Sequence, residues 1–185
     1  SRFAVLIDAE NVSVKYIKII FDELSKDGIA TYKRIYGDWT NPSLISWKST
    51  LLDNSITPIQ QYSYTSGKNS TDSAMIIDAM DILYSGKVDG FCLVTSDSDF
   101  TKLAMRLREE QMYVIGMGES KTPLALTKAC NKFIHLDLIS GEVEDKNAEG
   151  IKTAGSGRKQ KALAAEDKQD STVCLLYTSP SPRDC

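Results

Sequence analysis

The chain has 185 residues, of which 42% are hydrophobic and 25% charged, and its formal net charge is -3. This composition predicts one ordinary globular domain with a sizeable core. The acidic balance excludes a global attraction to nucleic acid or anionic lipid, so any contact with nucleic acid has to be local. No apolar run approaches the roughly 18 residues that a membrane span needs. The first apolar run begins at Phe3 and is typical of a strand, not of a signal peptide.

Cysteine usage indicates the redox environment. The four cysteines have neither zinc-ligand spacing nor the density of a disulfide scaffold: Cys92, Cys130, Cys174 and Cys185. We therefore expect a reduced, cytoplasmic protein.

Strand and helix patterns alternate along the first 138 residues. Short apolar runs predict strands at 3–7, 29–36, 57–62, 91–95 and 112–117, with a short last strand at 133–138. Helical apolar spacing predicts helices at 12–26, 43–52 and 72–83 and after residues 99 and 122. This alternation is typical of βαβ units, and it predicts a parallel sheet that is covered by helices on both faces.

The composition changes at Ser140. Gly, Lys, Glu, Ala and Gln dominate from there to about Ser171, without a periodic apolar pattern. We therefore predict a domain at 1–139 and a disordered tail at 140–185. The last dozen or so residues, from about Val173, fit neither part, so we interpret them as non-native and leave them out of the functional argument.

Acidic residues cluster at three predicted element boundaries. Asp8 and Glu10 follow the first strand, Asp72 opens the third helix, and Asp97 and Asp99 follow the fourth strand. Ligands bind at the carboxyl ends of parallel strands, where the strand order reverses. If the reversal lies between strands 1 and 4, Asp8 and Asp97 are neighbours. Several carboxylates in one crevice repel each other unless a cation neutralises them, and Mg²⁺ or Mn²⁺ suits such ligands.

Some of these acids have a simpler structural interpretation. Asp99 can equally cap the helix that follows it, and Asp72 is favoured by the helix dipole whatever its function. Asp78 and Asp81 are interpreted as solvated or locally hydrogen-bonded helix residues and not as ligands. The two aspartates that directly end apolar strands are harder to explain in this way.

Other chemistries fit the sequence less well. His135 is the single histidine, which argues against a catalytic triad or a ribonuclease that uses histidine as acid and base. The sequence has no P-loop and no G-x-G-x-x-G after its first strand, which argues against nucleoside triphosphate and dinucleotide binding.

Four motifs occur in order within residues 3–138. They are Ile7-Asp8-x-x-Asn11, Tyr36-Gly37-Asp38-Trp39, Gly67-Lys68-x-x-x-Asp72 with Ile77-Asp78-Ala79 beyond it, and Thr95-Ser96-Asp97-Ser98-Asp99-Phe100. Together they resemble the motif set of the NYN domain family, specifically its bacterial LabA-like branch, which is related to PIN-domain nucleases. The resemblance implies a PIN-like three-layer α/β/α fold with a mainly parallel sheet of order 3-2-1-4-5. It also implies a metal-dependent endoribonuclease that hydrolyses phosphodiester bonds of single-stranded RNA.

The resemblance also implies roles for individual residues. Asp8, Asp72 and Asp97 match the positions of catalytic ligands for Mg²⁺ or Mn²⁺. Asp99 matches a further catalytic ligand or an orienting acid, and Asn11 matches a polar group beside the first ligand.

Candidate substrate contacts are polar or basic side chains near the predicted site: Asn11, Lys68, Ser96, Lys102 and Lys121. The lysines are placed to hold flanking phosphates, although Lys68 and Lys102 are also plausible as plain surface charges. Tyr62, Tyr64 and Trp39 are placed either to stack on unpaired bases or to pack near strand ends. We expect single-stranded RNA as the partner and no membrane, and we keep a homo-oligomer open.

Two rival functions remain open. A PIN-like fold with a weak site would serve as a non-catalytic RNA- or protein-binding module. A Mg²⁺-dependent phosphatase would need an aspartyl nucleophile with a second acid two residues on, a spacing that Asp8 and Glu10 match imperfectly.

Overall fold

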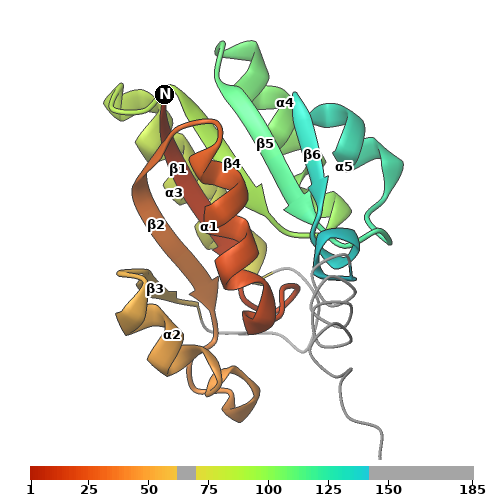
Figure 1. Ribbon diagram of the computed structural model, residues 1–185. Helices are drawn as coiled ribbons and strands as arrows, with labels where there is room; N and C mark the ends of the chain where they lie inside the picture. Colours follow the sequence, from red (N-terminus) through yellow and green to blue (C-terminus); the bar gives the residue numbers. More distant parts are fainter. Residues whose placement is uncertain (62–69, 142–185) are drawn as a thin grey trace, which may run out of the picture.

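The first apolar run of the chain forms the central strand β1 (Arg2–Asp8) of a parallel sheet in the computed structural model, which describes residues 1–61 and 70–141. Strand β2 (Ile29–Gly37) pairs with one side of β1, and β4 (Gly90–Val94) pairs with the other. All of β1 except its first residue is buried, which is typical of a central parallel strand covered on both faces. Figure 1 shows this strand in the middle of the sheet.

The sheet extends outward from this centre through three more strands. They are β3 (Thr57–Gln60) beside β2, β5 (Tyr113–Gly118) beside β4, and β6 (Lys132–His135) beside β5. Every pairing is parallel, and the order is 3-2-1-4-5-6. The predicted α/β class and the order 3-2-1-4-5 are confirmed, and the short last strand joins the sheet as its sixth member.

Five helices connect the strands. They are α1 (Ile17–Ser25), α2 (Trp47–Asp53), α3 (Ser70–Ser85), α4 (Thr101–Glu109) and α5 (Leu124–Ala129). Short 3₁₀ turns at Val14–Tyr16, Pro42–Leu44 and Ser98–Phe100 precede α1, α2 and α4. Residues 136–141 are helical as well.

Two hydrophobic cores lie on opposite faces of the sheet. On one face, Val5 and Ile7 pack in a cluster that includes Ile20 of α1 and Trp47 of α2. On the other face, the alternate residues of β1 pack in a cluster that includes buried side chains of α3, α4 and α5. Figure 1 shows α1 in front of the sheet and α3 behind it, so the predicted three-layer arrangement is confirmed.

Side chains alternate between the two faces of the sheet along each strand, and this alternation determines on which face each acidic residue lies. Asp8 continues the series of Ala4 and Leu6, whose side chains lie in the α3 and α4 core. Asp8 is also the register partner of Tyr36, which belongs to the same core. The first acidic residue therefore lies at the carboxyl end of the central strand, on the side of α3 and α4.

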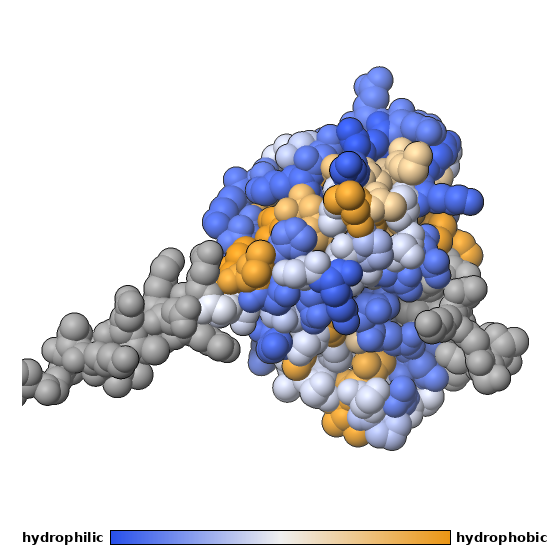
Figure 2. Space-filling model, turned by 90° about the vertical axis from the view of Figure 1, so that its right-hand side faces the viewer, coloured by the Kyte–Doolittle hydropathy of each residue, from blue (hydrophilic) through white to orange (hydrophobic). Residues whose placement is uncertain are grey.

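The described residues account for most of the predicted domain at 1–139, while the predicted tail lies almost entirely outside them. Several large apolar side chains are exposed, including Leu124 and Leu138. Figure 2, which faces the side of β6 and α5, shows small hydrophobic areas separated by hydrophilic ones. Within the described part of the chain, no helix combines the length and apolar character that crossing a bilayer requires.

Candidate active site

The carboxylate of Asp8 is fully buried and held at both oxygens. The main-chain N–H of Glu10 donates to Asp8 Oδ1 at 3.2 Å. The amide of Asn11 donates to Asp8 Oδ2 at 2.6 Å, and the hydroxyl of Thr95 donates to the same oxygen at 3.1 Å. Burial raises the pKa of Asp8, and the hydrogen bonds from Asn11 and Thr95 oppose that shift. The side chain is therefore oriented as an acceptor at the end of β1.

Thr95 links Asp8 to the second acidic cluster. It directly follows β4, is 1% exposed, and donates its own main-chain N–H to the carbonyl of Met117 on β5. Its Oγ1 accepts a hydrogen bond from the main-chain N–H of Asp97 at 3.1 Å. The hydroxyl oxygen of Thr95 is therefore the acceptor toward Asp97, and its hydrogen is donated to Asp8. The predicted proximity of Asp8 and Asp97 is therefore realised through Thr95.

Asp97, and not Asp99, caps the turn that leads into α4. The backbone of Asp97 is extended, with φ -86° and ψ 126°, and its Oδ1 accepts the main-chain N–H of Asp99 at 3.0 Å. Asp99 already lies inside the first turn, so the interpretation of Asp99 as the cap is wrong. The second oxygen of Asp97 accepts no hydrogen bond from the described residues, and the side chain is only half-buried.

Asp72 falls within the first turn of α3, but its side chain lies outside the described part of the structure. The start of α3 is held by β3, because Gln61 accepts the main-chain N–H of Ala74 at 3.1 Å. Gln61 itself donates its main-chain N–H to the carbonyl of Gly37, at the carboxyl end of β2. The first turns of α3 therefore lie at the same edge of the sheet as Asp8 and Asp97. The role of Asp72 stays a prediction.

The donor set was tested against a divalent cation. Among the side chains of 1–61 and 74–141, no group of three or more His, Cys, Asp or Glu residues could hold a metal ion. The Asp8 carboxylate and the main chain of Asp97 both contact the Thr95 hydroxyl at this edge, and carboxylate oxygens suit Mg²⁺ or Mn²⁺ as hard ligands. The described residues therefore fit part of a cation site, which Asp72 would have to complete.

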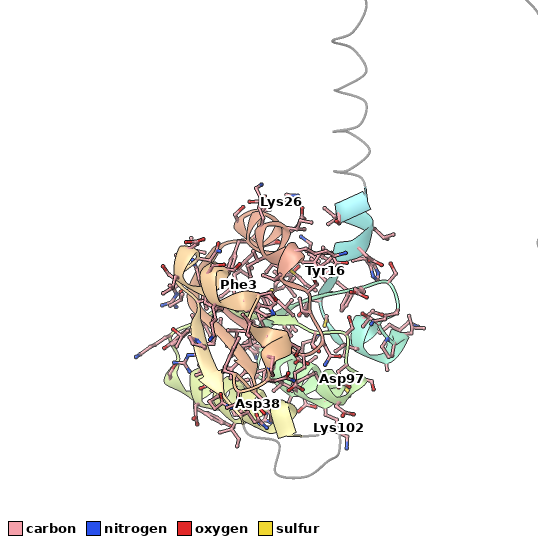
Figure 3. The ribbon with its side chains drawn as sticks, turned by 90° about the horizontal axis from the view of Figure 1, so that it is seen from below. Phe3, Tyr16, Lys26, Asp38, Asp97 and Lys102 are labelled. Atoms are coloured by element: carbon pink, nitrogen blue, oxygen red, sulfur yellow. The ribbon has the colours of Figure 1, made fainter. Side chains whose placement is uncertain are left out.

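The candidate substrate contacts are distributed around this edge, which Figure 3 views from the carboxyl ends of the strands. Asn11 is exposed and hydrogen-bonded to Asp8, while Ser96 Oγ accepts the main-chain N–H of Glu119 at 3.0 Å. Lys102 and Lys121 are both exposed, and Lys102 and Asp97 fall close together in the view of Figure 3. Lys68 lies outside the described residues.

Trp39 packs and does not present a free ring. It is half-buried against the α1 core, and its indole N–H donates to the carbonyl of Ile59 at 3.1 Å. This favours the packing interpretation of Trp39 over base stacking. The other two aromatic candidates, Tyr62 and Tyr64, lie outside the described residues.

Sequence reasoning missed an ionic network beneath the site. Asp78 of α3 forms an ion pair with Arg34 at 2.5 Å and accepts a hydrogen bond from the phenol O–H of Tyr36. Arg34 and Tyr36 both belong to β2. Burial and Asp78 raise the pKa of Tyr36. Asp78 is therefore bonded across to the sheet, so the expectation of a solvated or locally bonded residue is wrong for it. Asp81, in contrast, is exposed, as expected.

Asp38 is a further acid at this edge that was not assigned a role. Its Oδ1 accepts hydrogen bonds from the main-chain N–H and the hydroxyl of Thr40 and from the amide of Gln60. These bonds lower the pKa of Asp38. The position of Gln60 beside Asp38 depends on the pairing of β3 with β2, which a motif search does not show.

Comparison with known families identifies the domain. The NYN domain model matches residues 2–137, which is nearly all of the described structure. The chain belongs to the NYN domain family. NYN domains are members of the PIN-like nuclease superfamily, so the family predicted from the four motifs is confirmed. The match does not resolve the LabA-like branch, which stays a prediction.

Solved structures support the same fold for this NYN domain. The crystal structure of a protein of unknown function from Vibrio parahaemolyticus is similar, with a TM-score of 0.60 and 19% sequence identity. The similarity covers 72% of this chain and 91% of that chain. At this identity the likeness shows the fold alone. The comparison with curated proteins gives no match.

Proposed function

We propose that this NYN domain is a cytoplasmic, LabA-like endoribonuclease that depends on Mg²⁺ or Mn²⁺ and hydrolyses phosphodiester bonds of single-stranded RNA. One observation carries the proposal. The carboxylate of Asp8 and the main chain of Asp97 are joined through the Thr95 hydroxyl, at the point where the strand order reverses. Sites of α/β sheets are built at this point.

The residues of the chain divide the work between metal and substrate. Asp8, Asp72 and Asp97 would hold the cation, with Asp99 as a further acid at the same edge. A divalent cation at this site would lower the pKa of a bound water molecule and neutralise charge on the scissile phosphate. Thr95 and Asn11 keep Asp8 oriented by their hydrogen bonds. Lys68, Lys102 and Lys121 would bind the flanking phosphates, and Asn11 and Ser96 would contact the nucleotide between them.

The phosphatase alternative has less support. The carboxylate of Asp8 is held by hydrogen bonds at both oxygens, and the second acid of such an enzyme has to act beside it. The side chain of Glu10 is exposed, and its main-chain N–H is what contacts Asp8. This arrangement suits an anchored ligand better than a nucleophile.

A non-catalytic RNA-binding module is the second candidate. It is favoured by one observation, that the Asp8 carboxylate is fully buried and accepts hydrogen bonds at both oxygens. The two functions differ in whether bound RNA is cut.

Labelled single-stranded RNA separates these candidates. The purified chain is incubated with the RNA in Mn²⁺, Mg²⁺ or EDTA, and the ends of the products are analysed. The nuclease proposal expects cleavage only with a divalent cation and products with a 5′-phosphate and a 3′-hydroxyl. Binding without cleavage in any cation would favour the non-catalytic module, and release of inorganic phosphate from small monoesters would favour the phosphatase.

A further inference from the structure

The outward face of α3 is apolar, like the face that packs on the sheet. Inward side chains such as Met75 and Ile82 are buried in the core, whereas Ile77 is 63% exposed and Tyr84 is 69% exposed. Residues 74–84 include only two charged side chains, both of them aspartates. A helix that is apolar on all sides is usually buried on all sides. The exposed face of α3 is therefore a candidate contact surface.

This surface continues from α3 onto α4. Ile77, Asp81 and Tyr84 are spaced four and three residues apart, so their side chains lie along one side of α3. The guanidinium of Arg106 on α4 donates a hydrogen bond to the Tyr84 hydroxyl at 3.0 Å. Met105, next to Arg106 in the chain, is 52% exposed. These five residues form what we call the α3–α4 face.

We propose that the α3–α4 face is the interface of a homodimer, in which α3 of one copy packs on α4 of the other. Charge complementarity identifies the occupant as a second copy. The apolar residues of the face are accompanied by an acid on α3, Asp81, and by a base on α4, Arg106. A two-fold axis brings the acid of each copy to the base of the other, so the face is complementary to itself. Tyr, Met and Arg are also residue types that are enriched at protein interfaces.

Nucleic acid and anionic lipid fit this face less well. Glu109 and Glu110 are exposed at the end of α4, so Arg106 is surrounded by acids. A polyanion needs an excess of Lys and Arg. Arg106 forms an ion pair with Glu110, and the two side chains are 39% and 40% exposed. A pair with so much solvent contact is weak, so Arg106 can exchange Glu110 for a carboxylate of the second copy.

The charges also select the direction of the two-fold axis. Helices α3 and α4 both belong to parallel crossovers, so they run in the same direction. An axis across the helices would place α3 on α3 and oppose like charges. An axis along the helices places α3 on α4, which opposes Asp81 and Arg106. Because both helices follow the carboxyl ends of strands, such a dimer carries its two candidate active sites at the same end.

Sedimentation equilibrium of the full chain in EDTA tests the dimer, over a range of about 1–200 µM. Five residues are fewer than the roughly 20–30 on each side of a standard interface, so we expect a weak dimer with a Kd on the order of 10 µM. Its mass should approach twice the 20.5 kDa of the chain. Ile77→Asp should raise the Kd at least about tenfold, because it places a charge in the apolar part of the face. Leu52→Asp on α2, at a side chain that is 84% exposed, is the matched control and should keep the wild-type Kd.

Exchange of charges tests the pairing of α3 with α4. Asp81→Arg and Arg106→Asp should each raise the Kd at least about tenfold, because like charges then meet across the interface. The variant with both substitutions should return to within about threefold of the wild-type Kd, since each acid again faces a base. Thermal melts at low protein concentration check that every variant is folded. Restoration by the second substitution cannot result from damage to the fold.

Association in EDTA does not depend on RNA cleavage, so this proposal and the proposed function fail separately. A wild type that stays monomeric at about 200 µM overturns the dimer. Wild-type association of Ile77→Asp overturns the α3–α4 face as its interface. Equal Kd values for the wild type and the two single charge variants overturn the pairing of α3 with α4. A monomeric wild type whose Ile77→Asp variant loses affinity for labelled single-stranded RNA would assign the face to RNA instead.

Discussion

Thr95 donates its hydroxyl hydrogen to Asp8 Oδ2 at 3.1 Å, across the boundary between β4 and β1. The Thr95 hydroxyl oxygen, Oγ1, in turn accepts a hydrogen bond from the main-chain N–H of Asp97 at 3.1 Å. One buried hydroxyl therefore fixes both the carboxylate that ends the central strand and the start of the turn after β4. We therefore expect Thr95 to act as a positioning residue for the proposed site.

Replacing this hydroxyl should weaken both fold and activity. Thr95→Val keeps the shape of the side chain but leaves the N–H of Asp97 without its acceptor, which should lower the free energy of unfolding by about 1–3 kcal/mol. Loss of a residue that orients a metal ligand should lower cleavage about 10–100-fold. Urea unfolding and single-stranded RNA cleavage check both. Thr95→Ser keeps the hydroxyl and should restore activity; if it is as inactive as Thr95→Val, the hydroxyl is not the reason.

The cap formed by Asp97 gives a second prediction. Asp97→Ala removes the acceptor for the N–H of Asp99 and should lower the free energy of unfolding by about 1 kcal/mol. Asp97→Asn should stay within a few tenths of a kcal/mol of the wild type, since Asn is an equally good cap. Asp99→Ala should keep this hydrogen bond to Asp97, because the donor is the main-chain N–H of residue 99. Equal stability of the Ala and Asn variants in thermal melts would contradict this role.

The buried carboxyl of Asp8 predicts a pH dependence in the absence of metal. Burial raises the pKa of Asp8, so the folded chain takes up this proton at a higher pH than the unfolded chain does. The contribution of Asp8 to the free energy of unfolding should therefore rise as the pH falls from 7 through the raised pKa. The measurement is the stability of the wild type minus that of Asp8→Asn, in EDTA, across this range. A difference that does not change with pH would contradict the raised pKa.

Gly118, at the end of β5, predicts a steric effect. A Cβ atom there would lie 2.8 Å from Ser96 Oγ, 2.8 Å from the carbonyl oxygen of Thr95 and 2.9 Å from Thr122 Oγ1. Gly118→Ala should therefore lower the free energy of unfolding by about 1–3 kcal/mol. Gly141→Ala is the control, because none of the described residues lies within 4 Å of its added Cβ, and it should change stability by less than about 0.5 kcal/mol. Similar effects of the two substitutions in urea unfolding would show that the strand end has room to relax.

The sequence was sufficient to predict the fold of the domain. Continuous apolar runs such as Phe3–Ile7 predict buried parallel strands, and the alternation with helices predicts a doubly covered sheet. Because Asp8 ends β1 and Asp97 lies in the turn after β4, beside the reversal of strand order, their proximity followed from topology. The four ordered motifs were sufficient for the family.

The finer features of the site depend on contacts that the sequence does not encode locally. A threonine after an apolar run is common, and the direction of the Thr95 hydroxyl bond becomes visible only when β1 and β4 are adjacent. The choice of Asp97 over Asp99 as cap depends on the extended backbone at Asp97. The loop that follows β5 is held by Asp137, which accepts the main-chain N–H of Ser120 and lies 17 residues from it in sequence.

The central claim is that Asp97 helps to hold a divalent cation that RNA cleavage requires. The most direct measurement pairs the Mn²⁺-dependent change in melting temperature with cleavage of single-stranded RNA, for the wild type, Asp97→Asn and the exposed control Asp81→Asn. Mn²⁺ at 100 times its dissociation constant should stabilise the wild type and Asp81→Asn by about 2.7 kcal/mol, and both should cut RNA. Asp97→Asn should melt like the wild type in EDTA, gain little from Mn²⁺ and leave the RNA intact. Wild-type cleavage by Asp97→Asn, or an undiminished response of its melting temperature to Mn²⁺, would contradict the account.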